Sequence, residues 1–329
     1  MNTDKIDFVV TWVDGNDPVW QEAKSHYVEA GADTRAARYR DWDQLKYWFR
    51  AIEKNTPWVN KIHFVTFGHL PKWLNLDNPK LHIVRHEDFI PKEFLPVFNS
   101  TAIEIHLHRI PGLSENFVYF NDDTYLMKPC KPTDFFKKGK PVDMALLTPV
   151  PENYGGEPYY YHLYNDYSIY KNYFSKKAFL GHIFKYCNIK YRGGAVSNLL
   201  NILCKNLYFS SLHFSKPYNK SSFETVWRDY GDVLLKTAKS RFRVYSNNSP
   251  QLFRGYQLIT GNFYPKRIQG IVLDTRKVDI AKNAIESGKY RLLCLSDNTS
   301  GDTFEADKEK INASFKKIYP VKSSFELPD

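Results

Sequence analysis

The chain has 329 residues and a formal net charge of +10 at pH 7, from 46 Lys and Arg against 36 Asp and Glu. Hydrophobic residues make up 43% and charged residues 25%, which excludes a wholly disordered chain, a collagen and a disulfide-rich miniprotein. A prior of roughly 150 residues per domain indicates about two domains, or one large α/β domain with an insertion. Aromatic side chains are frequent at 16%, but composition alone does not separate core residues from a sugar or nucleotide site.

We expect a cytoplasmic protein, with peripheral contact at the inner face of the cell membrane as a further option. No apolar run reaches the ~20 residues that span a bilayer. The first residues match neither a signal peptide nor a lipidation signal. The basic charge is compatible with nucleic acid, an anionic membrane or a phosphate-rich substrate, and equally with a generally basic surface. The cysteines form no Cys-x-x-Cys pair and are expected to be reduced thiols; they are Cys130, Cys187, Cys204 and Cys294.

The first half of the chain alternates predicted strands and helices. A β-branched and aromatic run predicts a buried strand at 6–13, which stops at a dense turn signal at 14–18. Helical spacing of apolar residues predicts a helix over 41–54 with Asp41 as its N-cap. Further along, we predict strands at 61–68, 81–86 and 116–123 and a helix at 99–110 capped by Asn99 or Ser100. This alternation predicts an α/β fold with a mostly parallel sheet and flanking helices.

The second half of the chain has a different composition and a different pattern of predicted elements. Residues 151–170 are rich in Tyr and turn residues, and 171–209 is predicted to be helical. After a turn-rich stretch around His213, another helix is predicted at 221–240, with an interruption at Gly231. Strands are then predicted at 268–274 and 290–297, before a final helix near 304–317. The simplest architecture is a core begun by residues 1–150, a mainly helical insertion at 151–264, and a C-terminal segment at 265–329 that completes the core.

Acidic or polar pairs follow several predicted strands: Asp14 with Asp17, Asp122 with Asp123, and Asp297 with Asn298. Ligands of open α/β sheets bind beyond the carboxyl ends of the strands, so these pairs could converge on one cleft. Oxygen ligands at such a cleft suit Mg²⁺ or Mn²⁺ beside a nucleotide diphosphate. Any one pair is explained equally well by a turn. Their repetition favours a functional site.

Other residues have a functional and an ordinary interpretation. Asp7 lies within the first apolar strand, where a carboxylate is costly unless it is paired, although it could also meet solvent at the sheet edge. His213 lies near Lys216 and Lys220, whose charges would lower its pKa and suit a general base. The ordinary alternative is a histidine on a surface loop. Arginines at 38–41 and 240–243 suit phosphate oxygens or a solvated charged face.

The sequence also resembles a known family. Residues 6–18, IDFVVTWVDGNDP, closely resemble the first signature of the Stealth family of sugar-phosphate transferases. The second region is similar to 38–75, 86–91 and 98–126, the third to 212–227 and 241–261, and the fourth to 293–298 and 319–326. The four regions occur in family order and cover most of the chain.

This resemblance implies a bacterial enzyme with a GT-A-like nucleotide-sugar transferase core. Such an enzyme transfers hexose-1-phosphate from a UDP-hexose to a hydroxyl of a glycan or lipid-linked oligosaccharide and releases UMP. The product is a phosphodiester link in a capsular or other surface polysaccharide. The implied cofactor is Mg²⁺ or Mn²⁺, and no nucleic-acid partner is expected.

The resemblance also assigns roles to residues. The implied catalytic residues are Asp7, Asp122, His213 and Arg243. His213 is our candidate for the base, with Asp123 or Asp7 as competitors. The implied metal ligands are Asp122, Asp123 and Asp297. The implied substrate-binding residues are Thr11, Trp12, Asp14, Arg38, Asp41, Lys216, Lys220 and Asn298.

Two other functions are compatible with parts of the pattern. A conventional metal-dependent glycosyltransferase would use the acids at the strand ends equally well, but would release UDP. A non-catalytic module that binds polyanions or glycans would use the basic and aromatic residues and leave the acids without a purpose.

Overall fold

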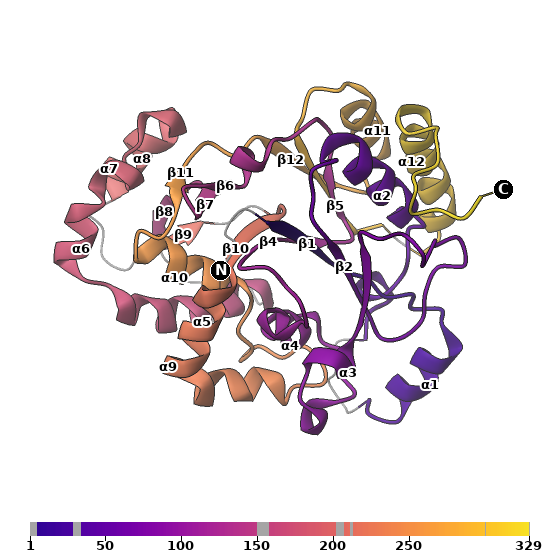
Figure 1. Ribbon diagram of the computed structural model, residues 1–329, viewed down its shortest axis with the longest axis horizontal. Coiled ribbons are helices and arrows are strands. Elements are labelled where there is room, and N and C mark those ends of the chain that lie inside the picture. Colours follow the sequence, from indigo (N-terminus) through magenta and orange to yellow (C-terminus); the bar gives the residue numbers. More distant parts are fainter. Residues whose placement is uncertain are drawn as a thin grey trace.

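A computed structural model describes residues 5–28, 34–149, 158–201, 207–210, 213–299 and 301–328. Its main sheet has five strands in the order β10-β4-β1-β2-β3 and lies at the centre of Figure 1. The strands are β1 (Ile6–Thr11), β2 (Ile62–Thr66), β3 (Leu81–Arg85), β4 (Asn116–Asn121) and β10 (Lys216–Asn219). β1 pairs in parallel with both β2 and β4, β2 pairs in parallel with β3, and β10 is antiparallel to β4. The predicted α/β fold with a mostly parallel sheet is therefore confirmed.

Both faces of the main sheet are buried, each against its own hydrophobic core. Neighbouring residues of a strand point to opposite faces and therefore join different cores. Phe8 and Val10 of β1 join one core, and Val9 joins the other. The first core contains the apolar side of α2 (Leu45–Asn55). The second contains side chains of α4 (Ser100–Glu104) and of the long α9 (Lys220–Ala238). In Figure 1, α2 therefore lies on the opposite side of the sheet from α4 and α9.

Two predicted helices differ from the structure. α2 begins at Leu45 with Gln44 at the N-cap position, so Asp41 is not its cap. Instead the Asp41 carboxylate accepts a hydrogen bond of 2.9 Å from the Asp43 N–H, a local bond that competes with helix formation. The helix predicted at 99–110 is divided into α4 and the 3₁₀ turn η3 (Leu107–Arg109). Asn99 caps α4 as predicted.

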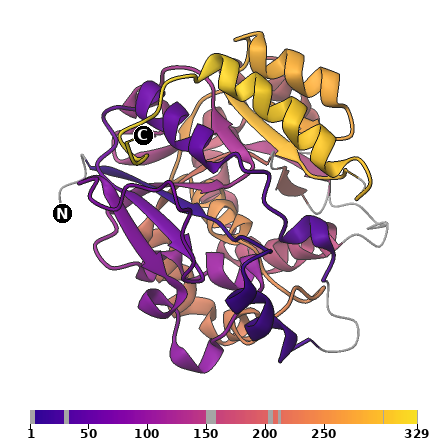
Figure 2. The same cartoon turned by 90° about the vertical axis from the view of Figure 1, so that its right-hand side faces the viewer.

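The C-terminal strands form a second sheet. β12 (Gly270–Asp274) pairs in parallel with β13 (Leu292–Ser296), and β13 pairs with the short β5 (Thr124–Leu126). The helices α11 (Val278–Glu286) and α12 (Phe304–Ile318) lie side by side in orange and yellow in Figure 2. Their buried side chains join the same core as β1 and α2. The C-terminal segment thus shares a core with the N-terminal half, although its strands belong to another sheet.

The middle of the chain is mainly helical, as its composition predicts. Its α-helices besides α9 are α5 (Pro158–Tyr170), α6 (Lys176–Gly181), α7 (Ile183–Tyr186), α8 (Gly193–Asn201) and α10 (Gln251–Ile259). α9 has non-helical backbone at Tyr230, next to the predicted interruption at Gly231. The sequence reasoning missed β10, because residues 212–220 read locally as turns and become a strand only by pairing with β4.

Smaller elements connect these layers. Two small sheets join β6 (Phe136–Lys137), β7 (Lys140–Asp143) and β11 (Tyr264–Pro265), and β8 (Leu146–Pro149) with β9 (Leu207–Ser210). The remaining helical turns are α1 (Pro18–Ser25), η1 (Ala36–Arg38), α3 (His86–Phe89), η2 (Lys92–Phe94), η4 (Pro132–Asp134), η5 (Lys171–Tyr173) and η6 (Ile189–Tyr191). Among the described residues, every helix is too short or too polar to cross a bilayer. Cys130, Cys187 and Cys294 are free thiols, as predicted, and Cys204 lies outside the described residues.

Candidate active site

A pocket of about 410 Å³ lies at the carboxyl ends of β1, β4 and β13. Thr11 ends β1, Asp122 and Asp123 follow β4, and Asp297 follows β13. Because β10 is antiparallel to β4, its first residue, Lys216, enters the pocket from the same edge. The predicted convergence of acidic strand ends is therefore observed for Asp122, Asp123 and Asp297, but not for Asn298 or for the pair Asp14 and Asp17.

The pocket brings together most of the predicted site residues. Those that line it are Thr11, Trp12, Arg38, Asp41, Asp122, Asp123, His213, Lys216, Arg243 and Asp297. Four other predicted site residues do not line the pocket as the structure describes it: Asp7, Asp14, Lys220 and Asn298.

Asp7 lies at the amino end of β1, about 13 Å of strand before Thr11. Its side chain is fully buried and accepts hydrogen bonds from the Asn60 amide (2.6 Å) and the Ser114 N–H (2.8 Å), and it contacts His63 at 3.2 Å. Burial alone would raise the pKa of Asp7, but the hydrogen bonds from His63, Asn60 and Ser114 outweigh it and lower the pKa. The geometry is that of a structural carboxylate away from the pocket.

The other three residues also have local roles. Asp14 accepts a bond of 2.8 Å from the Asn16 N–H, and its neighbour Asp17 caps α1, so this pair shapes a turn. Lys220 starts α9 at the far end of β10 from Lys216, which places it at the opposite edge of the sheet. Asn298 follows the pocket residue Asp297 and bonds Thr275 and Ser296 instead.

The acidic centre of the pocket consists of Asp41, Asp122 and Asp123. Burial raises the pKa of Asp41 to about 6, assisted by the charge of Asp43. Burial, with the negative charges of Asp123 and Asp41, raises the pKa of Asp122 well above its usual range. Within the described structure, the buried Oδ1 atom of Asp123 has no hydrogen-bond partner. Crowded carboxylates with an unpartnered oxygen fit a divalent cation, which would offset their repulsion.

His213 lies beside this centre. Its Nε2 is 3.3 Å from Oδ2 of Asp123, and its side chain is about half exposed. The buried thiol of Cys294 lies 3.7 Å from the same Oδ2 atom. One ligand atom from each of Asp123, His213 and Cys294 falls within 4.8 Å of the others. Burial raises the pKa of Cys294 well above its usual value, so this thiol stays protonated and is a poor ligand for Mg²⁺.

A buried polar network forms another part of the pocket wall. The Tyr119 hydroxyl donates to the Glu104 carboxylate (2.9 Å) and lies 2.9 Å from the Thr11 hydroxyl. Burial raises the pKa of Glu104, opposed by the Tyr119 hydrogen bond and by the charges of Arg243 and Lys216. Arg243 donates to the Ser100 hydroxyl at 2.6 Å. Burial, with the charge of Arg254, lowers the pKa of Lys216 to about 8. Arg243 and Lys216 thus lie in the same pocket wall as the acids.

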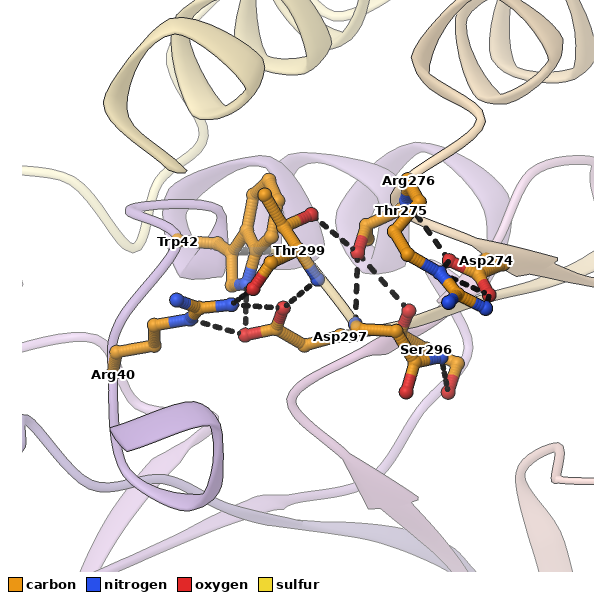
Figure 3. Close-up of polar contacts among 9 residues, drawn as sticks. Arg40, Trp42, Asp274, Thr275, Arg276, Ser296, Asp297 and Thr299 are labelled. Carbon is orange, nitrogen blue, oxygen red and sulfur yellow. Dashed lines mark hydrogen bonds and ion pairs between the residues drawn. The ribbon is translucent and has the colours of Figure 1, made fainter. Parts of the chain in front are cut away.

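Asp297 is held by an arginine rather than left open for a metal. Arg40 donates to both carboxylate oxygens at 2.5 Å, and the Trp42 indole donates at 3.0 Å. Figure 3 shows Arg40 reaching across to Asp297, with Trp42 beside the pair and Thr299 close by. A carboxylate paired with a guanidinium in this bidentate way has little charge to offer a cation. Asp297 thus forms an ion pair with Arg40 in this structure, and its metal role stays a prediction.

Comparisons with known proteins relate this geometry to a family. The family model for Stealth protein CR1, conserved region 1, matches residues 4–31, and that for CR2, conserved region 2, matches residues 38–143. A capsular polysaccharide phosphotransferase, WcwK, from Streptococcus pneumoniae is 39% identical over 99% of each chain. A receptor polysaccharide phosphotransferase, WefC, from Streptococcus oralis is 38% identical over 98% of this chain and 99% of its own.

The chain belongs to the Stealth family. This Stealth protein is a phosphotransferase, as predicted. The first two family regions of the sequence analysis fall within the matched ranges, whereas the third and fourth stay predictions. Among solved structures, the galactosyltransferase LgtC, in complex with donor and acceptor sugar analogues, matches over 98% of both chains at 10% identity and a TM-score of 0.38.

The residues of the pocket wall to which the sequence reasoning assigned no role include Arg40, Glu104 and Tyr119. Glu104 had a usable signal, because it is an acid in a run of mainly apolar residues, as Asp7 is. Arg40 lies between Arg38 and Asp41, which were chosen, but its partner Asp297 is 257 residues away. Tyr119 is one of many aromatic strand residues and carries no distinguishing pattern.

Proposed function

We propose that this protein transfers hexose-1-phosphate from a UDP-sugar to a hydroxyl of a glycan acceptor and releases UMP. The link formed is a phosphodiester, and the pathway is the synthesis of a capsular or other surface polysaccharide. The observation that carries the proposal is the convergence of Asp122, Asp123, His213, Arg243 and Lys216 on one pocket. The relatives support it, since they are named capsular and receptor polysaccharide phosphotransferases.

In this proposal His213 acts as the base. The acceptor hydroxyl would give its proton to Nδ1 of His213, while Asp123, whose Oδ2 lies 3.3 Å from Nε2 of the same ring, would hold the ring and stabilise its charge. The oxygen would then form a bond to the β-phosphorus of the donor. The bond from that phosphorus to the oxygen bridging it to the α-phosphorus would break, and UMP would leave with the bond electrons. The anomeric carbon keeps its configuration because no bond to it changes.

The cations of the pocket would bind the phosphoryl oxygens and neutralise their charge. Phosphoryl transfer depends mainly on positioning and on neutralising charge. Arg243 offers a planar fork of donors, and the buried Lys216 offers a point charge that is strong in a dry environment. Arg38, Thr11 and Trp12 line the donor side of the same pocket in this proposal.

A divalent cation, Mg²⁺ or Mn²⁺, would be held by Asp122 and Asp123 rather than by the set that included Asp297. Their crowding, and the unpartnered Oδ1 of Asp123 among the described residues, fit such an ion. The ion would neutralise charge on the diphosphate.

The proposal also covers the roles of the segments of the chain and the place where the acceptor is used. We propose that residues 1–150 and 265–329 form the donor-binding core and that 151–264 supplies acceptor and catalytic residues, since His213, Lys216 and Arg243 come from it. The acceptor is a glycan or a lipid-linked oligosaccharide, used in the cytoplasm or at the inner face of the membrane.

The test is a donor screen with purified protein, Mg²⁺, a panel of UDP-hexoses and a crude surface-glycan extract. Nucleotide products are separated by chromatography. We expect UMP from one donor, dependent on the extract and lost when EDTA is added. Asp123→Asn should abolish this UMP, while Asp274→Asn, which changes a partly buried carboxylate paired with Arg276, should not.

Release of UDP instead would overturn the phosphotransfer and favour a conventional glycosyltransferase with the same acids. Absence of both products, together with salt-sensitive glycan binding that survives Asp123→Asn, would favour a binding module.

A further inference from the structure

An apolar and basic surface projects from the body of the protein, away from the pocket residues. It consists of the outward side chains of α6, η6, α7 and α8, and we call it the α6–α8 surface; its apolar members are Leu180, Phe184, Ile189, Val196, Leu199 and Leu200. Phe184 is 85% exposed and Ile189 is 88% exposed. In Figure 1 these helices form one edge of the molecule, opposite α11 and α12.

The exposure is not a sign of loose packing. The same helices are anchored to the body by inward side chains, chiefly Tyr186, Tyr191 and Asn198, which are all buried. The Tyr186 hydroxyl donates to the Leu258 carbonyl at 2.9 Å. The Asn198 amide donates to the carbonyls of Ala145 and Tyr186, each at 2.6 Å. Buried side chains thus anchor α7, η6 and α8, and Phe179 of α6 stacks on Tyr186, while the outer sides of these helices present apolar groups to water.

The charge of this segment is one-sided. Residues 171–201 contain six cations and no Asp or Glu, and no acid occurs anywhere from residue 167 to residue 223. Lys176, Lys177, Lys190 and Arg192 are exposed. A stretch this long without an acid is unusual in a chain where charged residues make up 25%.

Apolar side chains beside cations match one kind of partner. We propose that the α6–α8 surface binds an anionic phospholipid bilayer, with Phe184, Ile189 and the outward face of α8 entering the interface and the lysines contacting headgroups. Val196, Leu199 and Leu200 have the i, i+3, i+4 spacing that puts them on one face of α8. The cations add an attraction to negative lipid that apolar burial alone lacks.

The alternatives fit less well. A second copy of the chain meeting this surface with its own would bring two sets of cations together without acids to pair them. Nucleic acid would be attracted by the cations, but aliphatic groups such as Ile189 and Leu200 offer bases no stacking surface. The proposal deepens the membrane contact suggested under the proposed function, and its test uses no sugar donor or acceptor, so either can fail without the other.

The experiment is flotation of the purified full-length protein with vesicles of phosphatidylglycerol mixed with phosphatidylcholine, compared with phosphatidylcholine alone. We expect binding to the anionic vesicles and little to the neutral ones. Phe184→Ser with Ile189→Ser should weaken this binding by at least roughly tenfold. Lys176→Glu with Lys177→Glu should weaken it by about tenfold, and more at low salt.

Matched variants elsewhere control for general effects of polarity and charge. Leu76→Ser with Val321→Ser removes exposed apolar groups, and Lys310→Glu with Lys316→Glu reverses exposed charges on α12; both should bind as the unmodified protein does. Circular dichroism checks that each variant is folded. The proposal is overturned if the unmodified protein does not float, or if Phe184→Ser with Ile189→Ser floats equally well. It is also overturned if the protein binds single-stranded RNA but no vesicle, or if that double variant merely converts a dimer to a monomer.

Discussion

Asp7 and Asp122 are both acids at ends of the central strands, yet the groups around them shift their pKa values in opposite directions. Asp7 faces three hydrogen-bond donors at the amino edge of the sheet, which stabilise its charge. Asp122 faces other acids at the carboxyl edge, which destabilise its charge. Burial opposes ionisation in both cases, so the neighbours decide the outcome. The first arrangement is suited to holding a fold together and the second to attracting a cation.

Asp7→Asn should lower the free energy of unfolding by about 1–3 kcal/mol, because buried donors lose a charged acceptor. The pKa of Asp7 lies below its ordinary value of 3.8 in the folded state. Its contribution is therefore fully present above that value and is lost as the pH falls through the folded pKa. Urea unfolding at neutral and acidic pH should show the difference between variant and unmodified protein shrinking below about pH 4.

The same variant separates structure from chemistry. Once corrected for the folded fraction, Asp7→Asn should retain turnover, because Asp7 does not line the described pocket wall. A stable, folded and inactive variant would show that Asp7 takes part in the chemistry, as the family resemblance implied.

His213→Ala should lower turnover by about 10²–10⁴-fold, the range for loss of a general base. Added imidazole should restore part of the activity, since the space of the ring opens to solvent. His26→Ala, on an exposed residue at the end of α1, is the matched control and should be neutral. Near-full turnover at neutral pH without His213 would make Asp123 the better candidate for the base.

At the scale of elements, one wall of the pocket is a loop held at two points. The N–H of Gly15 donates to the Tyr39 carbonyl at 2.9 Å, and a Cβ at Gly15 would lie only 2.3 Å from that oxygen, so glycine is needed there. Arg40, one residue later, pairs with Asp297 after β13. The loop therefore joins the turn after β1 to the end of the second sheet.

Asp297→Asn tests whether that acid is structural or a metal ligand. Because Asp297 is already paired with Arg40, its loss should leave the dissociation constant for Mn²⁺ unchanged within about twofold, whereas Asp123→Asn should raise it by at least about tenfold. Isothermal titration calorimetry measures both. Asp274→Asn, at the end of the neighbouring β12, is the control. A large loss of Mn²⁺ affinity in Asp297→Asn would return that residue to the metal site.

At the scale of the whole molecule, segments far apart in sequence share one core. Phe315 of α12 is fully buried and stacks on Tyr47 of α2 at a ring distance of 5.7 Å, and it packs against Tyr125 at 4.8 Å. Near the C-terminus, Phe325 packs against Phe49 at 5.0 Å. The C-terminal segment is therefore expected to fold together with the N-terminal half rather than by itself.

Phe315→Ala should lower the free energy of unfolding by about 3–5 kcal/mol, the usual cost of removing a buried ring. Unfolding followed by tryptophan fluorescence and by circular dichroism should remain a single transition with coincident midpoints. Phe184→Ala, on a ring that is 85% exposed, should change stability by less than about 0.5 kcal/mol. Two separated transitions would show that the C-terminal segment folds independently.

Local pattern was sufficient for several elements. The β-branched and aromatic runs predicted β1, β2, β3, β4 and β13, because buried parallel strands consist of consecutive apolar residues. The acids that follow β4 and β13 were predicted to converge, because the carboxyl ends of such strands face a shared cleft. Asn99 was recognised as a cap from its residue type and position.

The fold class, the family and the edge of the sheet where the site lies could all be predicted from the sequence, since they depend on periodicity and on motifs. Which candidate residues reach the pocket depended on how distant segments pack. Lys216 and Lys220 are four residues apart, yet the direction of β10 sends them to opposite edges of the sheet. Asp297 is paired with Arg40, a partner 257 residues away in the sequence. Such contacts depend on strand direction and long-range pairing, which no local pattern encodes.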